Sequence, residues 1–471
     1  MERHAAIEEA SLDVLVIVAD ALRRDALDIE RSDGSPLRLR QRFTSWLWFE
    51  RYYASAPWTL PSTTSLFTGA DAARHGHWSH DHALTVPSLV GAIPDRRRIA
   101  VVNNPAVDRT SGLDVGFDEY HYVEDAAEFW ERSHEILQAR AADREPYFLV
   151  LHSNVVHDYH LPGARAHFER HIGPADPASY FDIGHGVLSW RDITPAQRPV
   201  VRRIYDACVL ELDERVDALL DVVDFDRTVI VFIADHGEGF EPLLARVHHG
   251  GRMHDDVLRI PCVVHLPSSV PPNVRATLEA ARSRTIGTVD IVPTLLDLVG
   301  VRVDAPDGQS FAHAGDGVAT RRVVRAEDDR YLYLANRLRL NINLTGKNMG
   351  RAARMRNRIW HRTVARTHRV RAYVDDPYKL IVSELQSRKR WLARAVSPLL
   401  TGLHNGRPAV VVDGDRWIGV ELFDRNRDPG ERNNLLRTRA DALVALQLAA
   451  ACDAGDTTRS LAVLAPAGQG E

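Results

Sequence analysis

The sequence predicts an α/β protein with a mainly parallel central sheet sandwiched by helices, and three observations lead to this prediction. Short, nearly continuous apolar runs recur along the first part of the chain, which is typical of strands buried on both faces. Helical patterns separate these runs, as in repeated strand–helix–strand units. The 471 residues exceed what one hydrophobic core usually supports, so a large domain with a smaller appendage is expected.

The first expected strand, residues 12–20, is an apolar run that ends in the carboxylate of Asp20. Similar runs are expected to form strands at residues 98–104, 147–152, 228–236 and 260–266. The intervening helical patterns are clearest at residues 205–223 and 289–300. Because functional groups in open α/β sheets gather at strand ends, Asp20 and the pair Asp235-His236 are expected to converge across the sheet.

A helix start follows residues 56–58. Thr59 precedes Pro61, which sets φ, and Ser62, which is able to cap a helix, and Gly69 closes the apolar helical run. A threonine at a helix entrance presents its oxygen beside free backbone N–H groups, where an anionic ester is favoured. Taken alone, this segment is an ordinary helix start.

Composition limits the possible classes of function. The chain is 45% hydrophobic and 26% charged, as in a soluble globular protein, and its net charge of −5 argues against a nucleic-acid partner. We find no apolar segment of the roughly 20 residues that span a bilayer and no apolar signal core at the N-terminus, so a cytoplasmic location is expected. The three cysteines fit a reducing compartment.

The composition of the sequence changes after residue 320. We expect a catalytic α/β domain over residues 10–320, a C-terminal subdomain over 321–453 with short antiparallel strands, and a tail over 454–471. The stretch between Arg351 and Arg390 is densely basic. It is either a solvated basic surface or a contact for an anionic substrate, a lipid surface or nucleic acid. Strands are expected at residues 378–382 and 417–424.

Four elements at strand ends or turns supply possible metal ligands: Asp20, Thr59, the pair Asp235-His236, and the turn that begins with His248-His249. Carboxylate and imidazole together suit Zn, Mn or Mg, and an oxygen-dominated set suits Ca. A single aspartate at a strand end is more often a helix cap. Two such ends that converge make a shared metal site credible.

The order of these segments resembles the sulfatase-like branch of the alkaline phosphatase superfamily. The resemblance covers most of the chain, and its specificity lies in the combination of segments. The matching segments are residues 16–25, 59–69, 74–76, 103–105, 112–118, 233–238, 254–261, 290–296, 422–424 and 428–435.

The resemblance implies roles for individual residues. Asp20, Asp235 and His236 would bind a divalent metal ion, which is Zn, Mn, Ca or Mg. Thr59 would be the nucleophile and a further metal ligand. His157 would contact the oxyanion of the substrate or protonate the leaving group.

Three more residues receive weaker assignments from the same resemblance. His249 would occupy the position of the basic residue that faces the ester, or of a ligand to a second metal. His248 is the alternative for that position. Asn104 would contact the substrate.

Three departures from the family pattern narrow the range of expected functions. Sulfatases proper generate formylglycine from Cys or Ser in a motif that ends in Arg, whereas this chain has Thr59 and Thr63 at those places. Ala21 stands where many sulfatases have a second aspartate, and Val155 replaces an acidic residue two positions before His157. These changes argue against formylglycine chemistry and against a complete second metal site.

We therefore expect a metal-dependent hydrolase or transferase that acts on an anionic substrate, a phosphate mono- or diester, through the hydroxyl of Thr59. One alternative is a sulfuric ester hydrolase that uses the unmodified threonine. A second alternative is a non-catalytic metal-binding scaffold, which the missing carboxylates at Ala21 and Val155 and the basic C-terminal stretch motivate.

Overall fold

The computed structural model describes most of the expected catalytic domain and parts of the C-terminal region. The described residues are 12–80, 83–143, 145–174, 198–240, 249–250, 253–312, 323–328, 368–386, 409–413, 416–435, 441, 444–445 and 447. His248, the tail at 454–471 and the basic stretch at 351–367 and 387–390 lie outside them.

The chain divides into two compact units. The first holds Met1–Phe240, Ala245–His248 and Asp256–Thr320, and the second holds Glu241–Leu244, His249–Asp255 and Arg321–Glu471. Each unit contains one of the two larger sheets. Among the described residues, no helix combines the length and the apolar character that a membrane crossing requires.

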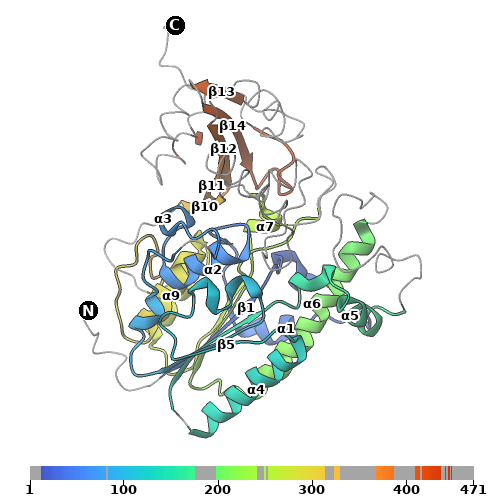
Figure 1. Ribbon diagram of the computed structural model, residues 1–471, viewed down its shortest axis with the longest axis vertical. Coiled ribbons are helices and arrows are strands. Elements are labelled where there is room, and N and C mark those ends of the chain that lie inside the picture. Colours follow the sequence, from blue (N-terminus) through green and yellow to red (C-terminus); the bar gives the residue numbers. More distant parts are fainter. Residues whose placement is uncertain are drawn as a thin grey trace, which may run out of the picture. The chain divides into compact units, whose positions relative to one another are not determined.

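A seven-stranded sheet with the order β2-β8-β7-β1-β6-β4-β5 forms the centre of the first unit (Figure 1). Strands β7, β1, β6, β4 and β5 run parallel, which confirms the expected fold class. The run at 260–266 forms β8, which pairs antiparallel with β7, so the sheet departs from parallel at this edge. The strands are β1 (Asp13–Ala19), β2 (Leu47–Trp48), β4 (Arg97–Val102), β5 (Glu119–Tyr122), β6 (Tyr147–Ser153), β7 (Thr228–Ile233) and β8 (Cys262–His265).

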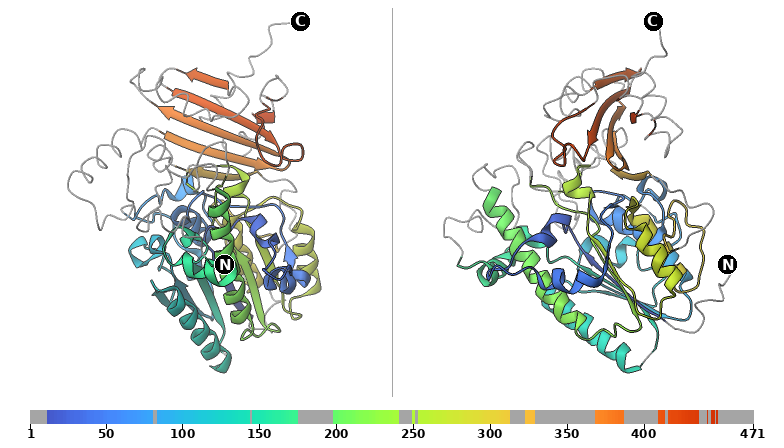
Figure 2. Two further views of the ribbon diagram at one scale, coloured as in Figure 1. Left: turned by 90° about the vertical axis from the view of Figure 1, so that its right-hand side faces the viewer. Right: turned by 180° about the vertical axis from the view of Figure 1, so that it is seen from behind.

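Helices cover both faces of this sheet, as a parallel sheet with buried apolar strands requires (Figures 1 and 2). Helices α4 and α6 pack together on one face, and α2 packs with α9 on the other. The helices are α1 (Arg38–Arg42), α2 (Thr59–Thr68), α3 (Ala72–His75), α4 (Ala126–Asp143), α5 (Ala164–His171), α6 (Arg198–Leu220), α7 (Asp255–Leu258), α8 (Pro272–Ala281) and α9 (Ile291–Leu298). A small parallel pair, β3 (Tyr52–Tyr53) and β9 (Ile286–Gly287), completes the unit.

Helix α2 begins at Thr59 itself, which is earlier than the capping pattern suggested. Pro61 and Ser62 therefore lie inside the first turn, and the expectation that Ser62 caps the helix is wrong, because its hydroxyl donates to the carbonyl of Asp235 at 2.6 Å. Gly69 ends the helix with φ of 62°, as expected for a left-handed C-terminal glycine. The bond from Ser62 ties the start of α2 to the end of β7.

The second unit contains a five-stranded antiparallel sheet with the order β10-β11-β12-β14-β13, coloured orange to red in Figure 2. Its strands are β10 (Val324–Asp328), β11 (His368–Asp375), β12 (Tyr378–Gln386), β13 (Ala409–Asp413) and β14 (Arg416–Asp424). Tyr373, Leu380, Val382, Val420 and Leu422 form its buried apolar core. Both strands expected here, at 378–382 and 417–424, lie within β12 and β14.

Candidate active site

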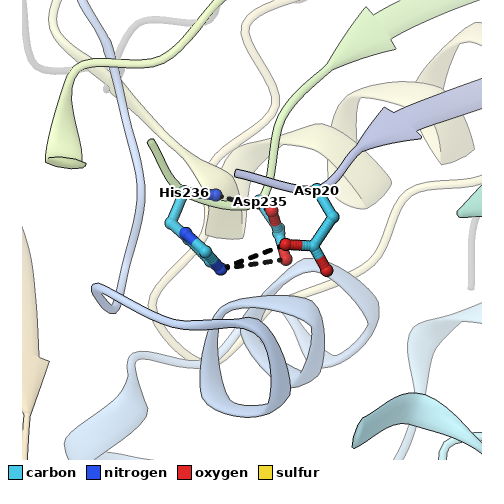
Figure 3. A group of neighbouring side chains, drawn as sticks. All are labelled: Asp20, Asp235 and His236. Atoms are coloured by element: carbon cyan, nitrogen blue, oxygen red, sulfur yellow. Dashed lines mark hydrogen bonds and ion pairs between the residues drawn. The ribbon is translucent and has the colours of Figure 1, made fainter. Parts of the chain in front are cut away.

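Three potential metal ligands meet at the carboxyl edge of the parallel sheet. Asp20 directly follows β1, and Asp235-His236 follows the neighbouring strand β7 after one residue. One ligand atom from each of the three lies within 4.8 Å of the others, and Asp20 and His236 are fully buried. Figure 3 shows the imidazole of His236 pointing at the two carboxylates. The convergence expected from the two strand ends is therefore present.

The tautomer of His236 follows from its hydrogen bonds. Its Nδ1 lies 2.8 Å from the carbonyl oxygen of Gly237, which can only accept, so Nδ1 carries the proton. Nε2 faces Asp20 Oδ1 at 3.4 Å and Asp235 Oδ2 at 3.6 Å. A histidine that donates one ring N–H to a backbone carbonyl while its other nitrogen meets carboxylates is arranged as a metal ligand.

The residues present fit a divalent cation. Asp20 Oδ1 and Asp235 Oδ2 are buried and have no hydrogen-bond partner. Burial and the charge of Asp235 raise the pKa of Asp20; burial also acts to raise the pKa of Asp235, but His236 and His152 outweigh it and lower that pKa. Unpaired buried carboxylate oxygens are costly unless a cation neutralises them. The donor set of two carboxylates and one imidazole suits Zn, Mn or Mg.

The hydroxyl of Thr59 lies beside this group. Its Oγ1 is 3.2 Å from Asp20 Oδ2 and 3.2 Å from His236 Nε2, and the side chain is 4% exposed. Because Thr59 is the first residue of α2, its hydroxyl lies at the positive end of the helix dipole. The hydroxyl therefore has a carboxylate, an imidazole and a helix N-terminus around it.

A series of hydrogen bonds through two side-chain amides, here called the amide chain, leads from Asp20 along the ends of β4 and β6. Asn104 Oδ1 accepts from the N–H of Ala106 at 2.7 Å, which leaves its amide N–H groups toward Asp20 Oδ2 at 2.5 Å and Asn154 Oδ1 at 2.9 Å. Asn154 in turn donates to Asp158 Oδ1 at 2.6 Å. Sequence reasoning gave Asn154 no role, although it follows β6 directly, just as Asp20 follows β1.

His157 joins the same chain through Asp158, whose Oδ1 lies 3.3 Å from His157 Nδ1. Its side chain keeps 21% of its surface exposed. Burial acts to lower the pKa of His157, but the charges of Asp20 and Asp158 outweigh it and raise the pKa to about 9. A partly exposed imidazolium beside Asp20 has the properties of a proton donor or an oxyanion contact.

The turn after Asp20 has an unusual backbone. Ala21 adopts φ of 58°, in the left-handed region that residues other than glycine rarely adopt. Its backbone N–H donates to Asp235 Oδ1 at 3.3 Å. The hydroxyl of Tyr205, on α6, donates to the carbonyl of Ala21 and accepts from the N–H of Arg23, each at 2.9 Å. Strain of this kind at a functional site is held by the surrounding hydrogen bonds.

The remaining histidines and Thr63 differ in their surroundings. His152 is 1% exposed, with Nε2 3.5 Å from Asp235 Oδ2 and 3.4 Å from Thr63 Oγ1, so it supports Asp235. Thr63 therefore places a hydroxyl against a histidine at the motif position where sulfatases have arginine. His249 is buried and belongs to the second unit, and its role stays a prediction, as does that of His248.

Solved structures with this fold include sulfatases and phosphonate monoester hydrolases. The phosphonate monoester hydrolase of Agrobacterium radiobacter has a TM-score of 0.60 at 16% identity, covering 93% of this chain and 94% of that one. The phosphonate monoester hydrolase of Silicibacter pomeroyi has a TM-score of 0.58 at 17% identity, with 93% and 94% covered. A 2-O GAG sulfatase has a TM-score of 0.57 at 16% identity, with 94% and 91% covered. No curated protein matches the chain.

The fold is thus that of the sulfatase branch of the alkaline phosphatase superfamily. The sequence profile described as Sulfatase matches residues 13–301, which is more than half of the chain. The chain therefore belongs to the sulfatase family of hydrolases.

Proposed function

We propose that this protein is a metal-dependent hydrolase or transferase of phosphate mono- or diesters whose nucleophile is the hydroxyl of Thr59. The observation that carries the proposal is the position of Thr59 Oγ1, 3.2 Å from both Asp20 Oδ2 and His236 Nε2. A secondary alcohol is a poor nucleophile until a neighbouring cation or base helps to remove its proton. Asp20 or His236 would act as the base, and the cation would bind to the carboxylates and imidazole beside the hydroxyl.

Asp20, Asp235 and His236 would hold the cation, with Thr59 as a further ligand. When bound, the ion would supply positive charge that lowers the pKa of the hydroxyl and stabilises the transferring oxygens. Thr59 Oγ1 then forms a bond to phosphorus while the bond to the leaving oxygen breaks, which gives a phosphothreonine. Water or an acceptor alcohol resolves this intermediate in a second displacement.

The amide chain and His157 supply the remaining functions. Asn104 donates one amide N–H to Asp20 and the other to Asn154, and its Nδ2 lies 3.5 Å from Thr59 Oγ1, so it would donate to an oxygen of the transferring group by exchanging one of these bonds. His157 protonates the departing alcohol or contacts the oxyanion. Positioned donors of this kind supply much of the catalysis in phosphoryl transfer.

The identity of the nucleophile favours phosphate over sulfate. Sulfatases with formylglycine release sulfate from the covalent intermediate through its second hydroxyl, which Thr59 lacks. Thr63 also provides no cation at the motif position of the sulfatase arginine. A threonine ester of phosphate has an ordinary exit by attack of water or an alcohol at phosphorus.

The test is a parallel assay of aryl phosphate monoesters, phosphate diesters, phosphonates and sulfates with purified protein of measured metal content. We expect phosphate ester turnover with a metal bound, loss of at least about 100-fold in Thr59→Ala, and partial activity in Thr59→Ser, which keeps a hydroxyl. Thr68→Ala, at the other end of α2, is the matched control. Mass spectrometry of quenched reactions should find phosphate on Thr59.

Two results would replace the proposal. Turnover of aryl sulfate that exceeds that of aryl phosphate by a wide margin would make the protein a sulfuric ester hydrolase with an unmodified threonine. No turnover of any ester by the metal-loaded protein would make it a binding scaffold. Full phosphodiesterase activity in Thr59→Ala would remove Thr59 from the mechanism.

A further inference from the structure

A second cluster of histidine and glutamate side chains lies between helices α5 and α6, which pack side by side (Figure 1). One ligand atom each from His171, Glu211 and Glu214 lies within 4.8 Å of the others. These residues belong to helices on the flank of the first unit. They share no residue with the group formed by Asp20, Asp235 and His236.

The helical spacing brings the four relevant side chains together. His167 and His171 are four residues apart on α5, and Glu211 and Glu214 are three apart on α6, so each pair shares one helix face. His171 Nε2 lies 2.9 Å from Glu211 Oε2, and His167 Nδ1 lies 3.5 Å from the same oxygen. Two imidazole nitrogens therefore converge on one carboxylate oxygen, Oε2 of Glu211.

We propose that His167, His171, Glu211 and Glu214 form a second, structural metal site that binds a borderline divalent ion such as Zn²⁺ and joins α5 to α6. In a tetrahedral zinc site with bonds of about 2.1 Å, neighbouring ligand atoms are roughly 3.4 Å apart. The distance of 3.5 Å between His167 Nδ1 and Glu211 Oε2 is close to this value. The distance of 2.9 Å between His171 Nε2 and the same oxygen needs to widen by about 0.5 Å. Two imidazoles with carboxylates select Zn²⁺ over Mg²⁺ or Ca²⁺.

Two arginines contact the central carboxylate in different ways. Arg215 Nε donates to Glu211 Oε1 at 2.7 Å, on the oxygen that the histidines leave free, and so orients the carboxylate as an outer partner of a metal ligand does. Arg170 Nη1 lies 3.2 Å from Oε2, the oxygen that the ion would take. The ion and the guanidinium of Arg170 therefore compete, whereas the ion and Arg215 cooperate.

The exposures of the side chains permit this exchange. Glu211 is 1% exposed, but Arg170 is 54% exposed and can move into solvent when an ion arrives. Glu214 and His167 keep about a quarter of their surfaces exposed, which leaves a route for the ion. The other reading of the cluster is an ion-pair network in which both histidines only donate to Glu211. In an ion-pair network both arginines stabilise Glu211 in the same way. At a metal site, Arg170 opposes binding of the ion and Arg215 favours it.

The experiment uses the full chain with Asp20→Ala and His236→Ala, which remove the candidate catalytic site, after treatment with a chelator. Zn²⁺ is titrated by calorimetry and Co²⁺ by visible absorption. We expect one equivalent to bind, with a tetrahedral Co²⁺ spectrum. His171→Ala should abolish this binding. His121→Ala, which removes the surface pair between His121 and Glu119, is the matched control and should not change it.

The arginine variants keep the test decisive where a histidine variant does not fold. Arg170→Ala should tighten Zn²⁺ binding by about 10-fold, and Arg215→Ala should weaken it by about 10- to 100-fold. The proposal is overturned if the folded double variant binds no Zn²⁺, if His171→Ala binds it as well as its parent, or if both arginine variants change affinity in the same direction.

Discussion

Two buried clusters of carboxylates, one in each unit, show opposite ways of handling charge. In the first unit, Asp20 and Asp235 each keep one buried oxygen without a hydrogen-bond partner. In the second unit, the fully buried Lys379 lies 2.7 Å from Asp255 Oδ1 and 3.0 Å from Glu431 Oε1. Among the described residues, a buried lysine thus contacts the carboxylates of the second cluster, whereas those of the first cluster contact histidines.

The presence or absence of an internal cation distinguishes carboxylates that stabilise the fold from carboxylates that are available to bind a ligand. Arg425 adds a second internal cation to the C-terminal cluster through Asp255 at 2.8 Å and Asp376 at 2.8 Å. A buried carboxylate that is paired inside the protein holds parts of the fold together, and its loss leaves a partner unpaired. Buried carboxylates without a lysine or arginine partner keep their binding capacity for a metal. Opposite responses to substitution are therefore expected.

The largest effect is expected for Lys379→Met. The substitution leaves the buried Glu431 without its lysine and leaves Asp255 with Arg425 alone, so the second unit should lose about 3–5 kcal/mol of stability. Urea unfolding, with hydrogen exchange in β12 and β14, measures this loss. Arg427→Met is the matched control, because Arg427 is 86% exposed and its pair with Asp424 should contribute little. A loss below about 1 kcal/mol for Lys379→Met would break the comparison.

The next effect concerns the other cluster. Asp20→Asn removes the carboxylate whose pKa is raised by burial and by the charge of Asp235, so the metal-free protein should be at least as stable as the wild type. Its affinity for the divalent ion should fall by at least about 100-fold, together with ester turnover. Thermal unfolding with and without metal, and metal content after dialysis, give both values. Clear destabilisation of the metal-free variant would mean that Asp20 has a structural role like that of Asp255.

Acid should weaken the packing that holds helix α2, which begins at Thr59. The imidazole of His75 accepts from the N–H of His77 and contacts the carbonyl of Pro61 at 3.1 Å, and burial followed by the charge of His77 lowers its pKa to about 3. A lowered pKa means that the stabilisation is complete above about pH 6.5 and is lost as pH falls toward 3. At pH 5 the loss is roughly 2 kcal/mol.

His75→Gln removes this titrating group. The stability of the variant should therefore change less than that of the wild type between pH 7 and pH 5. Urea unfolding of both proteins at the two pH values measures the difference. Equal pH dependence in the two proteins would show that His75 is not the group that responds. The result would also show whether the framework of Thr59 depends on a neutral side chain rather than on ion pairs.

The smallest effect is expected for Tyr205→Phe, which leaves the carbonyl of Ala21 and the N–H of Arg23 without their partner. The cost should be about 1 kcal/mol of stability, with metal affinity lowered by no more than about 10-fold through the turn after Asp20. Tyr147→Phe is the control, since its hydroxyl makes only a 3.5 Å contact with Thr228. Equal metal affinity in both variants would mean that the turn holds without Tyr205.

The sequence predicted the sheet well because its strands are buried on both faces and therefore have continuous apolar runs. Asp20 and Asp235-His236 could be found for the same reason, since each follows such a run. Strand direction could not be predicted: β8 belongs to an apolar run as β7 does, but it runs antiparallel to β7. The start of α2 was also misplaced, because Ser62 bonds to Asp235, a residue far away in the sequence.

The sequence by itself determined the family, the strand ends that carry the ligands and the presence of a threonine where sulfatases have a formylglycine precursor. These properties are local, because they depend on residue identity and on hydrophobic periodicity. The tertiary structure decided which nitrogen of His236 faces the carboxylates, how Asn104 is oriented and which carboxylates have an internal cation. Such properties depend on hydrogen bonds and ion pairs between segments distant in the chain, and no local pattern records them.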